Sequence, residues 1–166
     1  MTMGSNRVKV LFVCMGNICR SPTVETVFKH AVKQAGLEDA IIADSVGTHD
    51  YHIGEPPDER AQQIAKQRGY DMSKLRARQI EIRDFERFDY ILAMDRDNLV
   101  LLERKCPLQY RNKLALFCDF DAGYAGQGVP DPYFGGAQGF EQVLDMAEQV
   151  SDSLLSHISE NLKSTL

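Results

Sequence analysis

The chain has 166 residues, of which 43% are hydrophobic and 26% are charged, and this is typical of one globular domain with a core of its own. Its formal net charge of -5 argues against broad binding to nucleic acids or anionic membranes. No apolar run reaches membrane-spanning length, and the first residues lack a signal-peptide pattern. Four cysteines in such a chain favour a reducing compartment over a disulfide scaffold, so we expect a cytoplasmic protein.

Strand and helix patterns alternate along the chain. Residues 8–13 form a nearly continuous apolar run, as expected of a strand that is covered on both faces. From residue 22 the apolar spacing becomes helical, and Gly36 is well placed to end this helix. The same reasoning predicts strands at 40–46, 88–94 and 113–117, helices at 56–69, 95–105 and 140–158, and a long loop at 119–139.

This alternation predicts an α/β fold with a parallel sheet flanked by helices. We expect a single domain over residues 6–163, and we expect residues 1–5 to be flexible or a remnant of cloning. Ligands of such folds bind beyond the carboxyl ends of the strands, where the strand order switches. The loop after the first strand begins at such an end.

That loop brings a thiol, an arginine and a run of backbone amides to the start of a helix. Its residues are Cys14, Met15, Gly16, Asn17, Ile18, Cys19, Arg20, Ser21 and Pro22. The amides and the helix dipole favour an anion here, and the same donors favour a thiolate, the reactive form of cysteine. Gly16 and Asn17 both tolerate the positive φ that converging amides tend to require. The loop therefore predicts a phosphate site with Cys14 as its nucleophile.

Arg20 follows Cys14 by six positions and would place a forked guanidinium at the rim of this site, a geometry that lysine lacks. The hydroxyl of Ser21 could donate to the sulfur of Cys14. A buried cysteine is more often a small hydrophobic residue. Of the four cysteines, however, only Cys14 has an arginine at this offset and lies at a strand-to-helix turn. The competing phosphate motif, a P-loop, is not matched.

The loop resembles the signature loop of the low-molecular-weight protein tyrosine phosphatases. The resemblance covers nearly the whole chain, because residues 44–48, 57–60, 77–79, 93–95 and 131–133 fall where the family has similar stretches. It implies a four-stranded parallel sheet with helices on both faces, a cysteinyl-phosphate intermediate, and neither a metal nor another cofactor. It also implies hydrolysis of phosphotyrosine monoesters and of other aryl or acyl phosphates. The expected partners are phosphotyrosine-containing proteins or small aryl phosphates, with inorganic phosphate as product.

Three aspartates of the long loop compete for the role of general acid on sequence alone: Asp119, Asp121 and Asp131. Asp131 precedes Pro132, and Asp-Pro is also a common turn starter. The resemblance decides for Asp131. As an acid it would protonate the leaving oxygen, and as a carboxylate it would deprotonate the water that hydrolyses the phosphocysteine.

The resemblance also assigns the remaining site residues. The phosphate would be bound by Met15, Gly16, Asn17, Ile18, Cys19, Arg20 and Ser21. A deep slot would be walled by Tyr51, Tyr133 and Phe134, with help from Met15 and Ile18. A short phosphoserine cannot reach a sulfur at the bottom of such a slot. Relatives that act on phosphoarginine carry threonine at the position of Ile18, so this residue favours phosphotyrosine.

A hydrogen-bond scaffold is expected to hold the strained loop through Asn17, Ser21, Ser45 and Asp95. Many relatives have a histidine two residues before the pair that matches Ala77 and Arg78, and this histidine joins the scaffold through an aspartate corresponding to Asp95. This chain has Leu75 there. Either its scaffold is less polar, or another group substitutes.

The role of Cys19 has two interpretations. It is either a buried hydrophobic residue or the partner of Cys14 in a reversible, protective disulfide.

Other functions are less well supported by the sequence. An arsenate-reductase-like reaction would need a closely spaced cysteine pair, whereas Cys106 and Cys118 are twelve positions apart. His49 and His52 are too few for a zinc site. Lys74, Arg76, Arg78 and Arg83 are expected on a solvated face, with attraction of acidic phosphopeptides as the alternative. The protein is expected to be a monomer, with weak dimerisation as the alternative.

Overall fold

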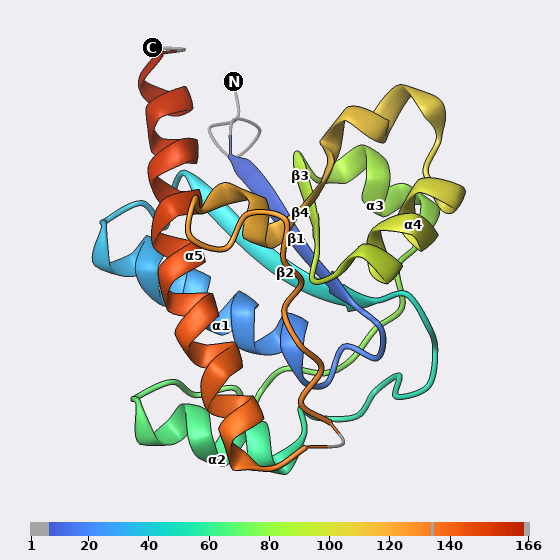
Figure 1. The fold of residues 1–166 in the computed structure, drawn as a ribbon. Helices are drawn as coiled ribbons and strands as arrows, with labels where there is room; N and C mark the ends of the chain where they lie inside the picture. The colour runs from blue at the N-terminus through green and yellow to red at the C-terminus, as the bar shows by residue number, and fades with distance from the viewer. Residues whose placement is uncertain (1–6, 134, 165–166) are drawn as a thin grey trace.

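The computed structural model describes residues 7–133 and 135–164. Strands and helices alternate along the chain (Figure 1). The elements are β1 (Val8–Cys14), α1 (Arg20–Gln34), β2 (Ile41–Gly47), α2 (Glu59–Gln67), α3 (Ile82–Arg87), β3 (Tyr90–Ala93), α4 (Arg96–Lys105), β4 (Leu114–Leu116) and α5 (Ala137–Ser164). Two short 3₁₀ helices, η2 (Leu108–Lys113) and η3 (Phe117–Phe120), flank β4.

The four strands form one parallel sheet in the order β2-β1-β3-β4, so the predicted sheet is confirmed. β1 pairs with β2 on one side and with β3 on the other. The strand order therefore switches between β1 and β3, and a ligand is expected beyond the carboxyl ends of these two strands. Cys14 ends β1 at this point, and Asp95 follows β3 closely.

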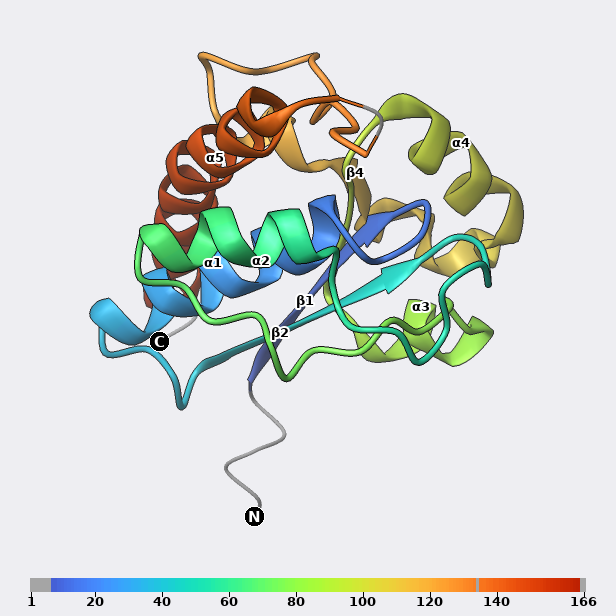
Figure 2. The same ribbon diagram turned by 90° about the horizontal axis from the view of Figure 1, so that it is seen from below.

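Helices cover both faces of the sheet, with α1, α2 and α5 on one side and α3 and α4 on the other (Figures 1 and 2). Side chains of β1 alternate between these layers: Val10 and Phe12 belong to the core beside α1 and α5, and Leu11 and Val13 belong to the other core. All four are fully buried, which explains the continuous apolar run.

Aromatic packing holds β1 against α1 and η3. The ring of Phe12 makes edge-to-face contacts with Phe28 at 5.5 Å and with Phe117 at 5.6 Å between ring centroids. Burying one such side chain contributes about 2 kcal/mol to folding. Because Phe12 lies on β1 and Phe28 on α1, this contact also holds the two ends of the loop between them.

Several predicted boundaries were wrong. The helix expected from residue 56 begins at Glu59, because Asp58 caps it by accepting a hydrogen bond from the Arg60 amide. β3 and β4 are shorter than predicted at 88–94 and 113–117, and α5 begins at Ala137, inside the predicted loop. α3 was not predicted, since only Asp84 and Phe85 of its six residues are buried and no apolar stripe results. Among the described residues, no helix is both long and apolar enough to cross a membrane.

Candidate active site

The sulfur of Cys14 lies at the junction of β1 and α1, where two hydrogen-bond donors face it. The Asn17 amide donates to Sγ at 3.3 Å, and the hydroxyl of Ser21 lies 3.1 Å from Sγ. Cys14 is only 3% exposed. The amino end of α1 is also open to an anion, because in the described structure the N-cap residue Cys19 makes no side-chain capping bond and the first turn holds no acidic residue. The surroundings of Cys14 therefore favour negative charge.

Asn17 holds the loop in its curled form. It has a positive φ of 59°, its side chain donates to Ser21 at 2.8 Å and to Ser45 at 3.0 Å, and its Oδ1 accepts the Arg78 amide at 3.0 Å. The oxygen of Ser21 accepts from Asn17, so its hydroxyl proton can be directed either to the sulfur of Cys14 at 3.1 Å or to the Val46 carbonyl at 3.4 Å. The structure thus brings Asn17, Ser21 and Ser45 together.

Gly16 differs from the expectation, because its φ is not among the positive values. A side chain there would be tight for another reason: a Cβ on Gly16 would lie 3.0 Å from Cδ2 of His52, so the His52 ring would have to shift. The close approach of His52, rather than backbone conformation, is what favours a glycine in the loop.

A buried carboxylate, absent from the sequence predictions, completes this network. Glu25 on α1 is 2% exposed, accepts a hydrogen bond from the Ser45 hydroxyl at 2.6 Å, and pairs with Lys29. Burial raises the pKa of Glu25, while Lys29 and Ser45 act in the opposite direction. Leu75 packs against the core instead. Through Ser45, Glu25 extends the hydrogen-bond network of Asn17 into α1.

Arg20 is 3% exposed and reaches from α1 to the loop between η3 and α5, residues 121–136, which we call the late loop. Its Nη1 donates to Asp95 Oδ2 at 2.5 Å and to the Val129 carbonyl at 3.1 Å, and its Nη2 lies 3.8 Å from Asp131 Oδ2. Burial opposes the charge of Arg20, but Cys14, Asp95 and Asp131 outweigh burial and raise its pKa. A cation is therefore fixed beside the sulfur.

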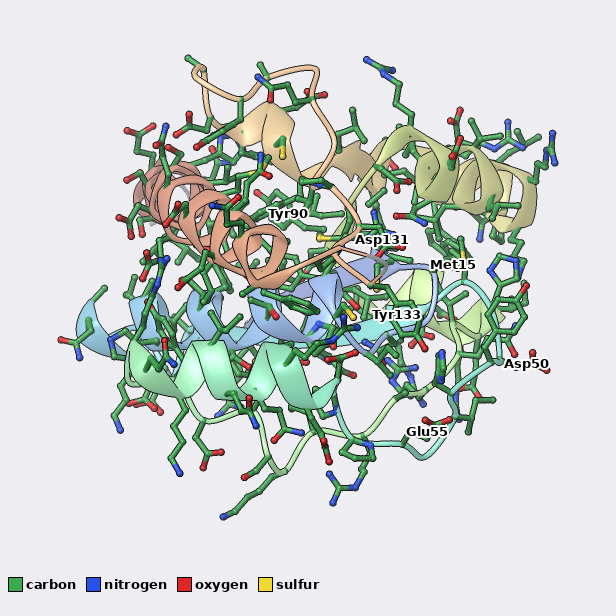
Figure 3. All side chains as sticks on the ribbon, turned by 60° about the horizontal axis from the view of Figure 1, so that its bottom comes forward. Met15, Asp50, Glu55, Tyr90, Asp131 and Tyr133 are labelled. Carbon is green, nitrogen blue, oxygen red and sulfur yellow. The ribbon has the colours of Figure 1, made fainter. Side chains whose placement is uncertain are left out.

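Cys14, Arg20 and Asp131 line a cavity of about 230 Å³. Figure 3 shows three labelled members of its lining, Met15, Asp131 and Tyr133, close to one another, and Cys14 contributes to the same lining. Tyr51 is 62% exposed at the mouth. The cavity is lined by Cys14, Met15, Gly16, Ile18, Cys19, Arg20, Tyr51, His52, Asp131 and Tyr133. Phe134 lies outside the described residues.

Of the three competing aspartates, only Asp131 lines this cavity in the described structure. Asp121 is tied to α5 through Ser153 and Gln149, and these hydrogen bonds lower its pKa despite partial opposition from burial. Asp119 accepts the Gly126 amide at 2.8 Å. Geometry thus separates the three, whereas the sequence left them equal without the resemblance.

The other three cysteines are free, buried thiols in different surroundings. Burial is the main cause that raises the pKa of Cys19, and it raises the pKa of Cys118 to about 11. Cys106 ends α4, and burial raises its pKa as well. The disulfide between Cys14 and Cys19 stays a prediction.

Arg78 corrects the expectation of a wholly solvated basic face. Its guanidinium bonds Asp44 at 2.9 Å and Asp84 at 3.0 Å, and its backbone amide holds Asn17. It therefore ties β2 and α3 to the loop. His52 also lines the cavity, although the sequence analysis discounted it. No sequence pattern identifies its position as part of the site.

Comparison with known proteins identifies the family. The sequence model described as low molecular weight phosphotyrosine protein phosphatase matches residues 9–164. A putative low molecular weight protein-tyrosine-phosphatase of Synechocystis is 44% identical over 93% of this chain and 99% of its own length, and a low molecular weight phosphotyrosine protein phosphatase of Schizosaccharomyces pombe is 40% identical over 93% and 99%. A crystal structure of an Entamoeba histolytica protein tyrosine phosphatase superimposes with a TM-score of 0.89 at 42% identity, covering 93% of this chain and 98% of that one. The chain belongs to the low molecular weight protein tyrosine phosphatases, which are phosphotyrosine hydrolases.

Proposed function

We propose that this phosphatase uses Cys14 as nucleophile, Arg20 as the cation that binds the transferred phosphoryl group, and Asp131 as general acid and base. One observation carries the proposal: these three side chains line a single cavity, with the sulfur at its buried end and Asp131, 42% exposed, nearer the solvent. A phosphate bound over the sulfur would have its leaving oxygen directed outward, toward Asp131.

In the first step the sulfur of Cys14 attacks phosphorus. The S–P bond forms as the bond from phosphorus to the leaving oxygen breaks, and Asp131 donates its proton to that oxygen. The amides of residues 15–20 and the guanidinium of Arg20 bind the three remaining oxygens, whose charge they stabilise as the group transfers. The product of this step is a cysteinyl phosphate.

In the second step a water molecule hydrolyses the cysteinyl phosphate. Asp131, now a carboxylate, takes a proton from the water as its oxygen attacks phosphorus, and the S–P bond breaks to restore the thiolate. Ser21 and Asn17, which face the sulfur at 3.1 Å and 3.3 Å, would stabilise this departing thiolate. Inorganic phosphate leaves the cavity.

The proposed substrates are phosphotyrosine-containing proteins or small aryl phosphates, and Tyr51, Tyr133 and Phe134 are proposed to contact the aromatic ring. Support comes from the depth of the cavity, because Tyr51 is 62% exposed at its mouth and the sulfur is buried. Free buried thiols are consistent with a reducing compartment, and we propose that the protein acts in the cytoplasm as a monomer.

Hydrolysis of p-nitrophenyl phosphate in the presence of a chelator tests the assignment. We expect Cys14→Ser to be inactive and still to bind phosphate, and Asp131→Ala to lose a factor of about 10²–10⁴ in rate. Asp119→Ala, which removes a carboxylate of η3 outside the cavity lining, is the control and should retain activity. Loss of activity in Asp119→Ala rather than in Asp131→Ala would refute the acid assignment.

A further inference from the structure

Arg60, in the first turn of α2, reaches the loop that carries Asp131. Its Nη2 donates to the backbone carbonyl of Tyr133 at 2.8 Å, and its Nη1 donates to the carbonyl of Gly135 at 3.4 Å. The guanidinium also lies 4.8 Å from the ring centroid of Phe140 and 5.6 Å from that of Tyr133. One side chain of α2 therefore contacts the late loop at several points between Asp131 and the start of α5.

The guanidinium is itself held by Asp58, which belongs to the phosphate-loop side of the site. Arg60 bonds Asp58 through Nε at 3.2 Å and through Nη2 at 3.0 Å. The backbone amide of Asp58 donates to the carbonyl of Ile18 at 2.8 Å. A continuous path of hydrogen bonds thus runs from Ile18 in the phosphate loop, through Asp58 and Arg60, to Tyr133 in the late loop.

Tyr133 connects this path to the carboxylate of Asp131. The Tyr133 amide donates to Asp131 Oδ1 at 3.0 Å, and the Tyr133 carbonyl accepts from Arg60. Figure 3 shows Asp131 and Tyr133 near each other. The contact of Asp131 with Arg20 is looser, with Oδ2 lying 3.8 Å from Nη2. The position of the carboxylate above the sulfur therefore depends on where Tyr133 is held.

We propose that Arg60 is a positioning residue for the general acid, fixing the distance between the phosphate loop and the loop that carries Asp131. The proposal rests on the role of Asp131 proposed above. Arg60 touches none of the reacting atoms, so its removal should impair protonation of the leaving oxygen and leave attack by Cys14 nearly intact. Small displacements of an acid are costly, because proton transfer needs hydrogen-bond geometry.

Leaving-group dependence tests the proposal, because an acid matters most when the departing oxygen is strongly basic. For Arg60→Ala we expect kcat/KM, which reports the steps up to release of the phenol, to fall about tenfold or more on phenyl phosphate and phosphotyrosine, whose phenols have a pKa of about 10. On an aryl phosphate with a strongly acidic phenol the fall should be less than about threefold. Arg60→Lys should behave like Arg60→Ala, since lysine keeps the charge but lacks the two-pronged geometry.

Lys66→Ala is the matched control, because it removes an exposed cation from the same helix and should leave both activities unchanged. In the double variant Arg60→Ala/Asp131→Ala, the loss should not exceed that of Asp131→Ala alone, since Arg60 is proposed to act only through the Asp131 carboxylate. Melting temperatures of all variants identify any loss that reflects unfolding.

The outcomes separate the two proposals. If Asp131→Ala loses kcat/KM equally on all leaving groups, Asp131 is not the acid and the proposed function fails first. If Asp131→Ala depends on the leaving group but Arg60→Ala only raises KM, Arg60 binds substrate and the positioning proposal is overturned. Additive losses in the double variant would overturn it as well.

Discussion

Glu25 is buried, and burial disfavours the negative charge of its carboxylate. It lies beneath Ser45 on the first turns of α1, with one oxygen facing the Ser45 hydroxyl and the other facing Lys29. Asp44 also faces it and adds to the unfavourable effect of burial. Lys29 is half exposed, so it offsets this effect only in part. The network under the phosphate loop therefore rests on a carboxylate that folding disfavours.

The stability of Glu25→Gln relative to the wild type should consequently rise with pH. Burial raises the pKa of Glu25 above its ordinary value of 4.5. A raised pKa means that the folded state favours the protonated form. The contribution of Glu25 to stability is then full below its ordinary pKa and is lost as pH rises through the raised value. Glutamine does not titrate and escapes this loss.

Urea unfolding of both proteins between about pH 4 and pH 7 measures the difference. Glu38→Gln, at an exposed position after α1, controls for the loss of one negative charge. A difference between Glu25→Gln and wild type that falls as pH rises would show that Lys29 and Ser45 outweigh burial.

At the scale of elements, Asp95 joins α4 to the phosphate site. Its Oδ1 caps α4 by accepting the Asn98 amide at 2.8 Å, and its Oδ2 accepts from Arg20. The two functions of this side chain can be separated, because serine can cap a helix but cannot neutralise a guanidinium.

We expect Asp95→Ser to lower the free energy of unfolding by about 2–3 kcal/mol, since it leaves the buried Arg20 without its carboxylate. Asp95→Ala should lose about 1 kcal/mol more, because the cap is lost as well. Both variants should bind phosphate less tightly, as measured by product inhibition. Urea unfolding that places Asp95→Ser level with wild type would mean that the pair with Arg20 contributes nothing to stability.

The elements that the sequence predicted well are those whose signal is local. β1 and its loop are contiguous, so Cys14 and Arg20 could be placed relative to one another from spacing alone. α3 is different: Glu81 and Asp84 form a capping box, but one buried aromatic residue in six positions gives no period to detect. The 3₁₀ helices around β4 likewise carry no apolar period.

The scaffold residues that escaped prediction act across long separations in sequence. Arg78 bonds Asp44 from 34 positions away, and Arg60 bonds Tyr133 from 73 positions away. From the sequence alone, both arginines are expected at the surface, because their partners come near only in the folded chain. Asp131 was separated from Asp119 and Asp121 only by resemblance and then by the cavity, because the sequence predicted all three in one polar loop.

At the scale of the whole molecule, the candidate site is where separate layers meet. β1 supplies Cys14, α1 supplies Arg20, the turn after β3 supplies Asp95, and the late loop before α5 supplies Asp131. Asp95 also caps α4, so the layer opposite α1 is connected to Arg20 at the site. An anion bound there contacts groups whose positions require most of the fold to be intact.

Phosphate should therefore stabilise the entire domain, because it binds the folded chain and has no assembled site in the unfolded one. At a phosphate concentration 100 times the dissociation constant, the free energy of unfolding should rise by about 2.7 kcal/mol, and the melting temperature should rise with it. Cys14→Ser should keep this gain, since Arg20 and the loop amides remain. Arg20→Lys should lose most of it, because one ammonium cannot replace the guanidinium fork. Potassium chloride at equal ionic strength is the control, and an equal gain in chloride would mean that screening of the net charge, rather than occupation of the loop, stabilises the protein.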